Sequence, residues 1–597
     1  MPEPLGADPP DPAAPVPPAG LPGPMGGSPE LPRRRWNLRS EPHPDAWSRL
    51  PREWGIPDAV LATLWNRGLE DPDAIQRFLA PKIEDLGDPN GLIDCERAVT
   101  RIAAALRNSE TLFVFGDYDV DGITAAALWV RLLRHFGARP LYKVPNRMED
   151  GYGLSVRTIE EAHAGGATVL IANDCGTSAH EAIERARALG IDVIVVDHHM
   201  PDATLPAAYA LVNPRRSDDS YPFPDLAAVG VAFKLLEALV ARIGGPEDLR
   251  HLRNHLDLVA VGSVADVVPL RGENRVLVHF GIRVLRARRR PAFQALMEQA
   301  GVADKWLESS TIAFSLAPRL NAAGRLGHPA LALELLLADD LESARSFAAR
   351  LEKDNDERKR LHEVVLREAV ETVEKDEGRG AYAIVLGSAG WHPGVLGIAA
   401  SRLVEQFGVP VVLVSLSGET ARGSARTPPG FDLLALVARA SEHLSAFGGH
   451  RQAVGLSLDP AHFVAFQTAL RDQSRAALAQ GVPEATLELD AALEPRQCDV
   501  ELARWVERLG PFGEGNKEPL YLARAFCRPG RVLKDRHLRI HVLANGRVID
   551  CIGFGLAPYA SEIPSGGAEM KLAFTPMLNR WRGQEQVQLK LREIDFV

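Results

Sequence analysis

The sequence predicts an α/β protein in which a parallel-sheet domain and a second α/β domain are joined by a long helix and followed by a small β-barrel. Three observations favour this fold class. Short apolar runs that end in polar residues alternate with amphipathic helical patterns over the first half of the chain, which is typical of a parallel sheet. Residues 342–375 have helical spacing without proline or glycine. Roughly the last hundred residues contain short β-type runs separated by turn signals.

Composition sets outer limits on function. With 597 residues, of which 46% are hydrophobic, the chain can bury several cores, and its length favours about three or four domains. The five cysteines lack the spacing of a zinc site or a disulfide framework, which favours a reducing cytoplasm. No apolar run is long enough to span a membrane, and we expect no membrane partner. The net charge of -10 argues against a broadly basic nucleic-acid coat but allows local basic patches.

The N-terminal part of the chain divides into a tail and a small helical region. Residues 1–39 are rich in proline, bury little apolar surface, and predict a disordered tail. Residues 40–94 show helical spacing, most clearly from Trp47 to Leu79, and predict an N-terminal helical cap. We interpret this cap as a packing element.

Acidic residues at the start of the first α/β domain, residues 95–328, carry the strongest functional signal. The apolar run 112–115 leads into Asp117, Asp119 and Asp121, and a helical pattern follows. Carboxylates this close repel one another unless a cation neutralises them, and hard oxygen ligands suit Mg²⁺ or Mn²⁺. From this stretch alone, an acidic turn that only caps the next helix remains an alternative.

Further polar residues follow or interrupt later apolar runs of the same domain. They are Asp174, His198, His199 and Asp266. Because the carboxyl ends of parallel strands face one crevice, we expect these side chains to meet the first three acids. An acid inside an apolar run also needs a partner, since an unpaired buried carboxylate is costly. The combination therefore predicts a metal site.

A loop at the same sheet edge offers contacts to a nucleic acid. Arg147 and Tyr152 follow the second predicted strand. An arginine there can grip a phosphate and an aromatic ring can stack on a base.

Residues 329–378 read as an almost continuous helical segment. Within it, residues 342–375 contain no proline or glycine, and a helix of that length spans about 50 Å, which suits a connector between two domains. A coiled-coil dimer seam is the alternative, but apolar heptads are not sustained along it. The charge run Glu352 to Arg360 indicates a solvated face.

The second α/β domain, residues 379–480, predicts a phosphate-binding face. Its later part contains Gly448, Gly449 and His450, and the segment 423–426 supplies Ser424 and Arg426. Glycines permit close backbone approach to a phosphate, and histidine can donate to a phosphate oxygen.

Residues 484–597 predict a small antiparallel barrel with a surface for single-stranded nucleic acid. Basic residues interleave with aromatic residues there, so that cations can meet the backbone while rings stack on bases. The basic residues are Arg528, Arg531, Lys534, Arg536 and Arg539.

Seven motifs in this order resemble one known superfamily. The motifs of the first domain, similar to those of the DHH phosphoesterases, are GDYDVDG, DCG, DHH and SVADVVPL. Three more, similar to those of the RecJ family within it, are APRLNAAGRLG, GWHPGVLGIAASRL and GGHRQAVG. The resemblance runs from about Trp47 to the C-terminus. It implies a DHH domain, a DHH-associated domain that closes over the active site, and an OB-fold barrel. It also implies a two-metal exonuclease that degrades single-stranded DNA from 5′ to 3′ to mononucleotides, in DNA repair and recombination.

The resemblance also implies roles for individual residues. Two ions, Mn²⁺ or Mg²⁺, would be held by Asp117, Asp119, Asp121, Asp174, His198 and Asp266. Asp174 would bridge them, and His199 completes the catalytic set with Asp119, Asp121, Asp174, His198 and Asp266. The predicted substrate-binding set is Arg147, Tyr152, Asn321, Arg325, His392, Ser424, Arg426, Gly448, Gly449 and His450. Many superfamily members have a histidine four residues before Asp119, where this chain has Phe115. The first ion then either loses a ligand or takes Asp117.

Partners and alternatives follow from the same resemblance. Besides single-stranded DNA, it implies a single-strand-binding protein and a RecQ-type helicase as partners, and we expect a monomer. One alternative is a DHH phosphodiesterase that acts on short oligonucleotides or cyclic dinucleotides, for which a barrel is unnecessary. Another is a non-catalytic replication scaffold of the same fold, against which the retained acids and histidine argue.

Overall fold

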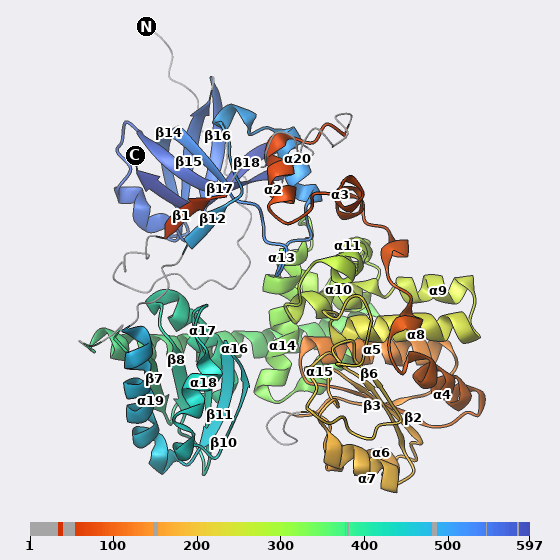
Figure 1. Cartoon of the computed structure of the whole chain (residues 1–597). Helices are drawn as coiled ribbons and strands as arrows, with labels where there is room; N and C mark the ends of the chain where they lie inside the picture. Colours follow the sequence, from red (N-terminus) through yellow and green to blue (C-terminus); the bar gives the residue numbers. More distant parts are fainter. Residues whose placement is uncertain are drawn as a thin grey trace.

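The fold is described from a computed structural model. It describes residues 34–39, 54–146, 153–376, 378, 381–479, 486–544, 546–581 and 584–596. Arg147, Tyr152 and residues 1–33 of the predicted tail lie outside these ranges. Two α/β lobes stand side by side, and a barrel lies at one end of them (Figure 1). In the described part of the chain, no helix is both long and apolar enough to span a membrane.

The first lobe is built on a five-stranded parallel sheet in the order β3-β2-β4-β5-β6, which confirms the predicted parallel sheet. Its strands are β2 (Leu112–Gly116), β3 (Leu141–Lys143), β4 (Val169–Asn173), β5 (Asp192–Val196) and β6 (Ala210–Val212). Side chains alternate between two cores: Val114 and Ile171 face one, and Phe113 and Leu170 face the other. Both faces are therefore apolar, as expected of a sheet with helices on each side.

Helices cover both faces of this sheet. On one side lie α4 (Cys95–Arg107), α5 (Val120–His135) and α8 (Ala228–Ile243), and on the other lie α6 (Val156–Ala164) and α7 (His180–Ala188). A helical layer extends the first core. It comprises α9 (Pro246–Arg253), α10 (Leu256–Ala265), α11 (Gly272–Arg286), α12 (Pro291–Gln299), α13 (Ser309–Thr311), the π-helix η4 (Ile312–Leu316), α14 (Ala317–Leu326) and α15 (Pro329–Leu337).

One helix, α16 (Leu341–Glu374), joins the two lobes. It begins where the Asp340 side chain accepts a hydrogen bond from the Ser343 N–H at 2.8 Å. Its first half packs into the core of the first lobe through residues such as Leu351, and its second half packs into the second lobe through residues such as Val365. The predicted connector is thus a single helix of 34 residues, about 50 Å long.

The second lobe contains a mixed five-stranded sheet in the order β10-β11-β9-β8-β7. Its strands are β7 (Ile384–Ser388), β8 (Val411–Ser415), β9 (Ala421–Arg426), β10 (Ala446–His450) and β11 (Ala453–Leu458). Only β7 and β8 pair in parallel. The accompanying helices are α17 (Leu396–Phe407), α18 (Leu433–Ala438) and α19 (Phe463–Leu478).

The C-terminal barrel closes because β14 pairs with both β15 and β17. Its elements are β13 (Ala491–Ala492), α20 (Val500–Arg508), β14 (Tyr521–Leu533), β15 (His537–Ala544), β16 (Arg547–Gly553), β17 (Ala568–Trp581) and β18 (Gln584–Phe596). The barrel was predicted as antiparallel, but β16 and β18 pair in parallel. The short helix η9 (Ala557–Ser561) lies between β16 and β17, so the chain does not return by a tight hairpin there.

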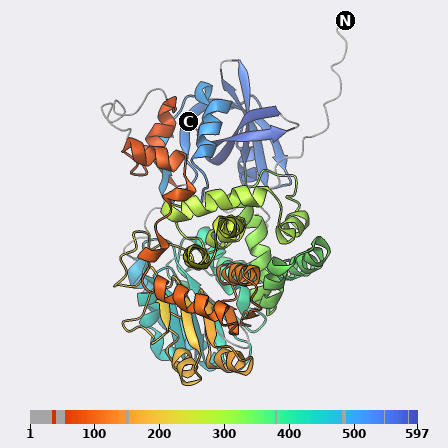
Figure 2. The ribbon, with the colours of Figure 1, turned by 90° about the vertical axis from the view of Figure 1, so that its right-hand side faces the viewer.

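The N-terminal cap packs on the barrel, although the barrel is formed by the C-terminal end of the chain (Figure 2). Helices α2 (Asp58–Trp65) and α3 (Pro72–Leu79) share one hydrophobic core with β14 to β18. The Thr63 and Tyr521 hydroxyls lie 3.0 Å apart within that core.

The prediction of a disordered tail through residue 39 is wrong for residues 34–39. Strand β1 (Arg35–Leu38) pairs in parallel with β12 (Thr486–Leu489), and the indole N–H of Trp36 donates to Glu593 at 2.8 Å. The partners of this segment lie more than 400 residues away in the sequence, so local composition could not reveal them.

Because the cap belongs to the barrel core, we expect a cap mutation to destabilise the barrel. Leu64 in α2 is 0% exposed, and Leu64→Ala should lower the free energy of unfolding by about 2–5 kcal/mol. Urea unfolding followed by circular dichroism measures the change. Val464→Ala is the control, since Val464 is 68% exposed and its truncation should cost little. Equal midpoints for the two variants would mean that the cap is docked too loosely to stabilise the barrel.

Candidate active site

Two glycines bring the end of strand β2 against the start of helix α5. A Cβ atom on Gly116 would lie 2.3 Å from the carbonyl oxygen of Gly122, and one on Gly122 would lie 2.5 Å from the amide nitrogen of Asp117. No side chain fits at those distances. Glycine at both positions therefore allows the strand and helix to approach closely, which packs the acidic residues of this turn together.

Each acid of this turn has a different local partner. Asp119 caps α5 by accepting hydrogen bonds from the Asp121 and Gly122 N–H groups at 2.9 and 3.2 Å. Asp121 accepts the N–H groups of Ala228 and Val229, which begin α8, at 2.7 and 2.9 Å. Asp117 is 2% exposed at the end of β2. The capping role considered from the sequence is thus present, but it belongs to only one of the three acids.

Residues from three other elements meet at His198, which follows β5. Its Nε2 atom lies 3.2 Å from Asp174 Oδ1, 3.6 Å from Asp266 Oδ2 and 3.8 Å from Asp121 Oδ2. Asp174 follows β4 with a φ of 61°, and Asp266 ends α10. The donor atoms form two groups of three that share His198. The groups are Asp174, His198 and His199, and Asp121, His198 and Asp266.

Several donor atoms in this cluster have no hydrogen-bond partner among the described residues. They are Asp117 Oδ1, Asp174 Oδ1 and His198 Nδ1, all buried. Buried polar atoms are normally satisfied, so the two carboxylate oxygens fit a site that binds a cation. Carboxylate oxygens and imidazole nitrogens are the donors that Mn²⁺ and Mg²⁺ accept, and the donor set therefore fits divalent cations.

Electrostatics also favour a cation here. Burial raises the pKa of Asp174 well above its usual value, and the charges of Asp119 and Asp121 raise it further. Burial and the neighbouring charge of Asp121 raise the pKa of Asp266 to about 9. These acids repel one another in a poorly solvated site, and a bound cation would reverse the effect.

Asp197 holds the two histidines in place. It accepts hydrogen bonds from the backbone N–H groups of Thr177, His198 and His199 at 3.1, 2.7 and 3.1 Å, and it lies 2.8 Å from His199 Nδ1. Burial alone would raise the pKa of Asp197. The hydrogen bond and charge of His199 lower it by more, so the net pKa is below its usual value. Asp197 is the first residue of the DHH motif and was not among the predicted site residues.

Phe115 is 0% exposed and packs in the core between the sheet and helices α6 and α7. It offers no ligand, so the acids around it must serve without a histidine at this position.

The predicted substrate-binding residues of the second lobe meet the first lobe near the start of α17. On β9, Arg426 Nη1 donates to Ser424 Oγ at 3.1 Å. A Cβ on Gly397 would lie 2.9 Å from Arg426 Nη2 and 3.0 Å from Ser424 Oγ. From the first lobe, Arg325 Nη1 donates to the Gly394 carbonyl at 3.2 Å. His392 Nδ1 accepts the Gly394 N–H at 3.1 Å.

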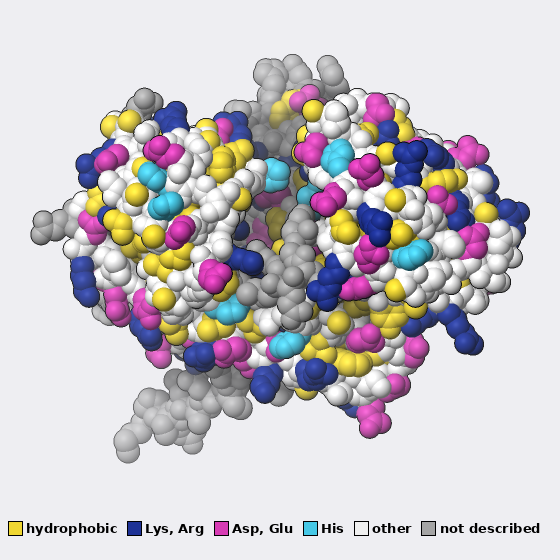
Figure 3. Space-filling view, turned by 90° about the horizontal axis from the view of Figure 1, so that it is seen from below, with side chains coloured by type: hydrophobic (Ala, Val, Ile, Leu, Met, Phe, Trp, Pro, Cys, Tyr) yellow, Lys and Arg dark blue, Asp and Glu magenta, His cyan; other side chains and the backbone are white. Residues whose placement is uncertain are grey.

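The remaining predicted residues of the second lobe lie on an exposed edge. Gly448, Gly449 and His450 belong to β10, the edge strand, and all three are exposed. The two lobes face each other across a deep cleft whose walls carry histidine and acidic side chains (Figure 3).

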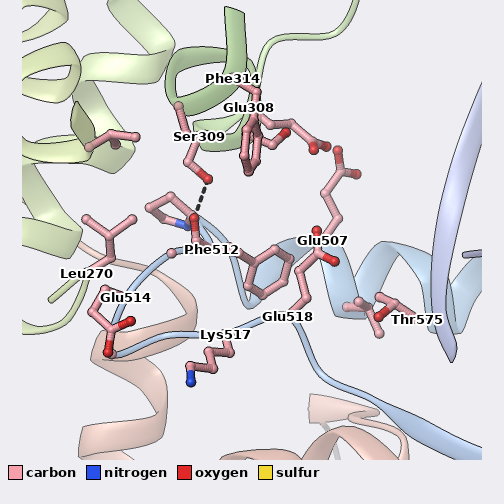
Figure 4. A pocket seen from close by; sticks show the side chains of 18 of the residues that line it. Leu270, Glu308, Ser309, Phe314, Glu507, Phe512, Glu514, Lys517, Glu518 and Thr575 are labelled. Carbon is pink, nitrogen blue, oxygen red and sulfur yellow. Dashed lines mark hydrogen bonds between the residues drawn. The ribbon is translucent and has the colours of Figure 1, made fainter. Parts of the chain in front are cut away.

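A cavity of about 1620 Å³ extends between the two lobes and the barrel. Next to the metal-type cluster it is lined by Ala265 and Val267, which flank Asp266, and by Asn321 and Arg325. At its barrel end, Glu308, Glu507 and Glu518 approach one another, while Ser309 Oγ donates to the Phe512 carbonyl at 2.5 Å (Figure 4). Arg580 and Lys590 form ion pairs with Glu507 and Glu518, so charge there is largely balanced.

The predicted basic surface of the barrel lies elsewhere. None of the five residues from Arg528 to Arg539 that were predicted to bind DNA lines this cavity. They lie on the β14–β15 hairpin or its turn, and Arg539 donates to Asp550 at 2.7 Å. The cations that line the cavity from the barrel domain include Arg580, Lys590 and Arg592, on β17 and β18, together with Arg508 on α20 and Lys517. Strand alternation could have identified the strand residues as outward-facing, but not as facing the lobes.

Three regions of the chain match known protein domains. The DHH family N-terminal domain matches residues 111–263, the DHHA1 domain matches residues 377–475, and the RecJ OB domain matches residues 489–593. The chain is 35% identical over 569 residues to the single-stranded-DNA-specific exonuclease RecJ of Escherichia coli, covering 92% of this chain and 97% of that protein. The chain belongs to the RecJ family.

Other RecJ proteins agree along nearly the whole length. The RecJ of Bacillus subtilis is 31% identical over 571 residues, which is 94% of this chain and 71% of that protein. The crystal structure of RecJ in complex with Mn²⁺ from Thermus thermophilus superposes with a TM-score of 0.78 at 29% identity, covering 94% of this chain and 79% of that chain. A Mg²⁺ complex of RecJ from the same organism gives a TM-score of 0.73. The DHH, DHH-associated and OB domains expected from the motifs are confirmed.

Proposed function

We propose that this chain is a two-metal exonuclease that degrades single-stranded DNA from its 5′ end to mononucleotides, in DNA repair and recombination. The observation that carries the proposal is the pair of metal-type groups that share His198, at the edge of a cavity that reaches the barrel. Membership in the RecJ family, whose named relatives are single-stranded-DNA-specific exonucleases, supports the substrate.

The residues proposed to hold two ions, Mn²⁺ or Mg²⁺, are Asp117, Asp119, Asp121, Asp174, His198 and Asp266. Bound ions supply Lewis acidity, which lowers the pKa of a water and neutralises charge on the phosphate. The chain contributes the geometry. Asp121 is fixed by the start of α8, and His198 is fixed by the hydrogen bond from its own N–H to Asp197.

His199 is placed to act on the phosphate itself. Burial lowers its pKa, but the hydrogen bond and charge of Asp197 raise it more, and the net pKa is about 9. In the metal-free protein the pKa of His199 is thus raised, and Asp197 holds the ring with Nδ1 3.8 Å from Asp174. A cationic imidazole there can donate a hydrogen bond to a phosphate oxygen as negative charge grows on it.

The second lobe and α14 are proposed to recognise the 5′ end. Arg325, His392, Ser424 and Arg426 lie around the start of α17, and Asn321 lines the same cavity as Arg325. The β10 residues Gly448, Gly449 and His450 are proposed as further contacts on the exposed edge of the second lobe. Arginine can bind a terminal phosphate through two N–H groups at once. Such a pocket next to the metals would set the direction of digestion.

The cellular setting is proposed from the same assignment. Single-stranded DNA is the substrate, and a single-strand-binding protein and a RecQ-type helicase are the proposed partners. We expect a monomer that works in the cytoplasm, which is consistent with five buried free cysteines.

Single-turnover digestion tests the proposed activity. Strands labelled at the 5′ or the 3′ end are digested with Mn²⁺ or Mg²⁺, and products are resolved by length. A 5′ label should appear at once in mononucleotides, while a 3′ label should stay in long fragments until the end. Rapid release of the 3′ label would reverse the direction, and digestion of dinucleotides alone would favour an oligonucleotide phosphodiesterase.

The raised pKa values of Asp266 and His199 predict how the stability of the metal-free protein changes with pH. Asp266 and His199 both have a pKa of about 9 in the folded protein, against usual values of 3.8 and 6.5. Between pH 7 and 9 the folded state therefore keeps protons that the unfolded state has lost, and stability should fall as pH rises. Thermal unfolding in EDTA measures this slope.

Saturating Mn²⁺ should raise the melting temperature and reduce that slope. At a hundred times the dissociation constant, a ligand that binds only the folded state adds about 2.7 kcal/mol. Asp266→Asn is the matched variant, since it removes one carboxyl whose pKa is raised without changing the size of the side chain. A melting temperature that does not change when Mn²⁺ is added would contradict the metal assignment.

A further inference from the structure

The middle of helix α16 carries an unusual set of polar residues. Leu351 packs in the core of the first lobe and Val365 in the core of the second, so the residues between them cross from one lobe to the other (Figure 1). Within this span Asn355, Arg358 and His362 follow at helical spacing and share one face. Asn355 is 1% exposed and His362 is 8% exposed. This inner face is therefore polar and shielded.

The charge of Arg358 is only partly balanced by its neighbours. It lines the cavity together with Asn321, Arg325 and Ile398. Its Nη2 donates to Asn355 Oδ1 at 3.0 Å, whereas its buried Nε finds no acceptor among the described residues. Within the same described set it forms no ion pair, although its helix neighbour Arg360 pairs with Glu357 at 2.6 Å. Burial lowers the pKa of Arg358 and the charge of Arg319 lowers it further, while the charges of Asp356 and Glu352 offset this only in part.

Such an arrangement is costly without a ligand. A shielded guanidinium that faces another cation loses hydration and gains no ion pair in return. Glu352, nearly two turns before Arg358 on the same helix, forms its salt bridge with a different arginine, Arg319. Asn355 has no access to solvent and presents its carbonyl oxygen to Arg358, which holds the guanidinium in one orientation.

His362 extends the same face by one turn. Its Nε2 atom is buried and unpaired within the described part of the chain. Burial lowers the pKa of His362 to about 4, and the charges of Arg358 and Arg402 contribute. His362 does not line the cavity, so it adds to the polar face of the helix without reaching a strand in the cavity.

We propose that Arg358, held in one orientation by Asn355, binds an internal phosphodiester of the strand, where it passes between the two lobes. This inference rests on the proposed function. The contact differs from the end-recognition pocket, because Arg358 lies on the connector helix and Arg426 lies on β9. A phosphate bound there sits on the one helix that packs into both cores, and so holds the strand at a fixed place relative to each lobe.

Binding without digestion tests the proposal. A fluorescein-labelled thymidine oligonucleotide is titrated with full-length protein in EDTA, by anisotropy, from about 50 to 300 mM salt. Arg358→Gln keeps length and hydrogen bonding but removes the charge. We expect about tenfold weaker binding, and a slope of log K against log salt that is shallower by about 0.7, the value for one phosphate on a single strand. Arg360→Gln, on the exposed face of the same helix, should leave both quantities unchanged.

Strands with one neutral methylphosphonate locate the contact. In the unaltered protein, one internal position should weaken binding most, and Arg358→Gln should erase that penalty at that position only. An unchanged salt slope together with an unchanged methylphosphonate profile would overturn the proposal and leave Arg358 as a packing residue. If the unaltered protein neither binds nor digests single strands, the proposed function fails instead. If it does both and the two variants behave alike, only this inference fails.

Discussion

Asp174→Asn should abolish hydrolysis while leaving the fold intact. Asp174 Oδ1 lies 3.2 Å from His198 Nε2 and accepts no hydrogen bond from the described residues. It is the residue proposed to bridge both ions, so its loss removes charge from two positions at once. We expect a fall in single-turnover rate of about three orders of magnitude or more, measured on 5′-phosphorylated strands with Mn²⁺.

Asparagine is a better probe than alanine at this position. Asp174 has a φ of 61°, where alanine is strained by about 1 kcal/mol or more and asparagine is tolerated. Asp174→Ala should be equally inactive but less stable. Asp202→Asn is the control. Asp202 is exposed and follows the DHH motif of residues 197–199, so this variant should keep full activity. Retention of more than a few per cent of the rate in Asp174→Asn would refute the bridging role.

Arg426→Ala should slow digestion of 5′-phosphorylated strands much more than that of 5′-hydroxyl strands. Arg426 and Ser424 face the start of α17, and Arg325 reaches the same place from the first lobe. A terminal phosphate carries more charge than an internal one and is open to bidentate contact. Loss of such a contact costs about 1.5–3 kcal/mol, which is roughly a ten- to a hundredfold change in rate.

The comparison of two ends separates this role from a structural one. Single-turnover rates on matched strands with and without a 5′ phosphate give the preference for each variant. Arg422→Ala, four residues earlier on β9 and exposed, should leave that preference intact. Equal slowing of both strands by Arg426→Ala would place the arginine on an internal phosphate or in a structural contact. The end pocket would then have to be sought around Arg147.

The clustering of acids could be predicted because strand geometry dictates it. Asp117, Asp174 and Asp197 directly follow β2, β4 and β5, which are neighbours in the sheet, so their side chains meet at one edge. Asp266 was predicted on a different ground. It ends a helix, and only the need of a buried acid for a partner linked it to the others. Local pattern and elementary electrostatics were sufficient for these residues.

Contacts between distant segments could not be predicted in the same way. The roles of Asp197 and Arg358 depend on hydrogen bonds that are present or missing in the folded chain, which no spacing reveals. The basic residues of β17 and β18 look like those of the β14–β15 hairpin in sequence. The way the barrel packs against the lobes determines which of these residues face the cavity. That packing involves surfaces made of residues far apart in the sequence, so the sequence pattern does not reveal it.

The core shared by the N-terminal cap and the C-terminal barrel has a consequence during translation. Helices α2 and α3 leave the ribosome first, but the strands that bury them begin about 450 residues later. At roughly 5–20 residues per second, their apolar faces stay uncovered for about 20–90 s. Leu64 and Ile75 are then exposed on a nascent chain that already contains both lobes. The cap is thus a natural site for a chaperone to hold, and a ribosome that stalls before β14 would release a protein with an intact metal-type cluster and an unprotected, aggregation-prone N-terminus.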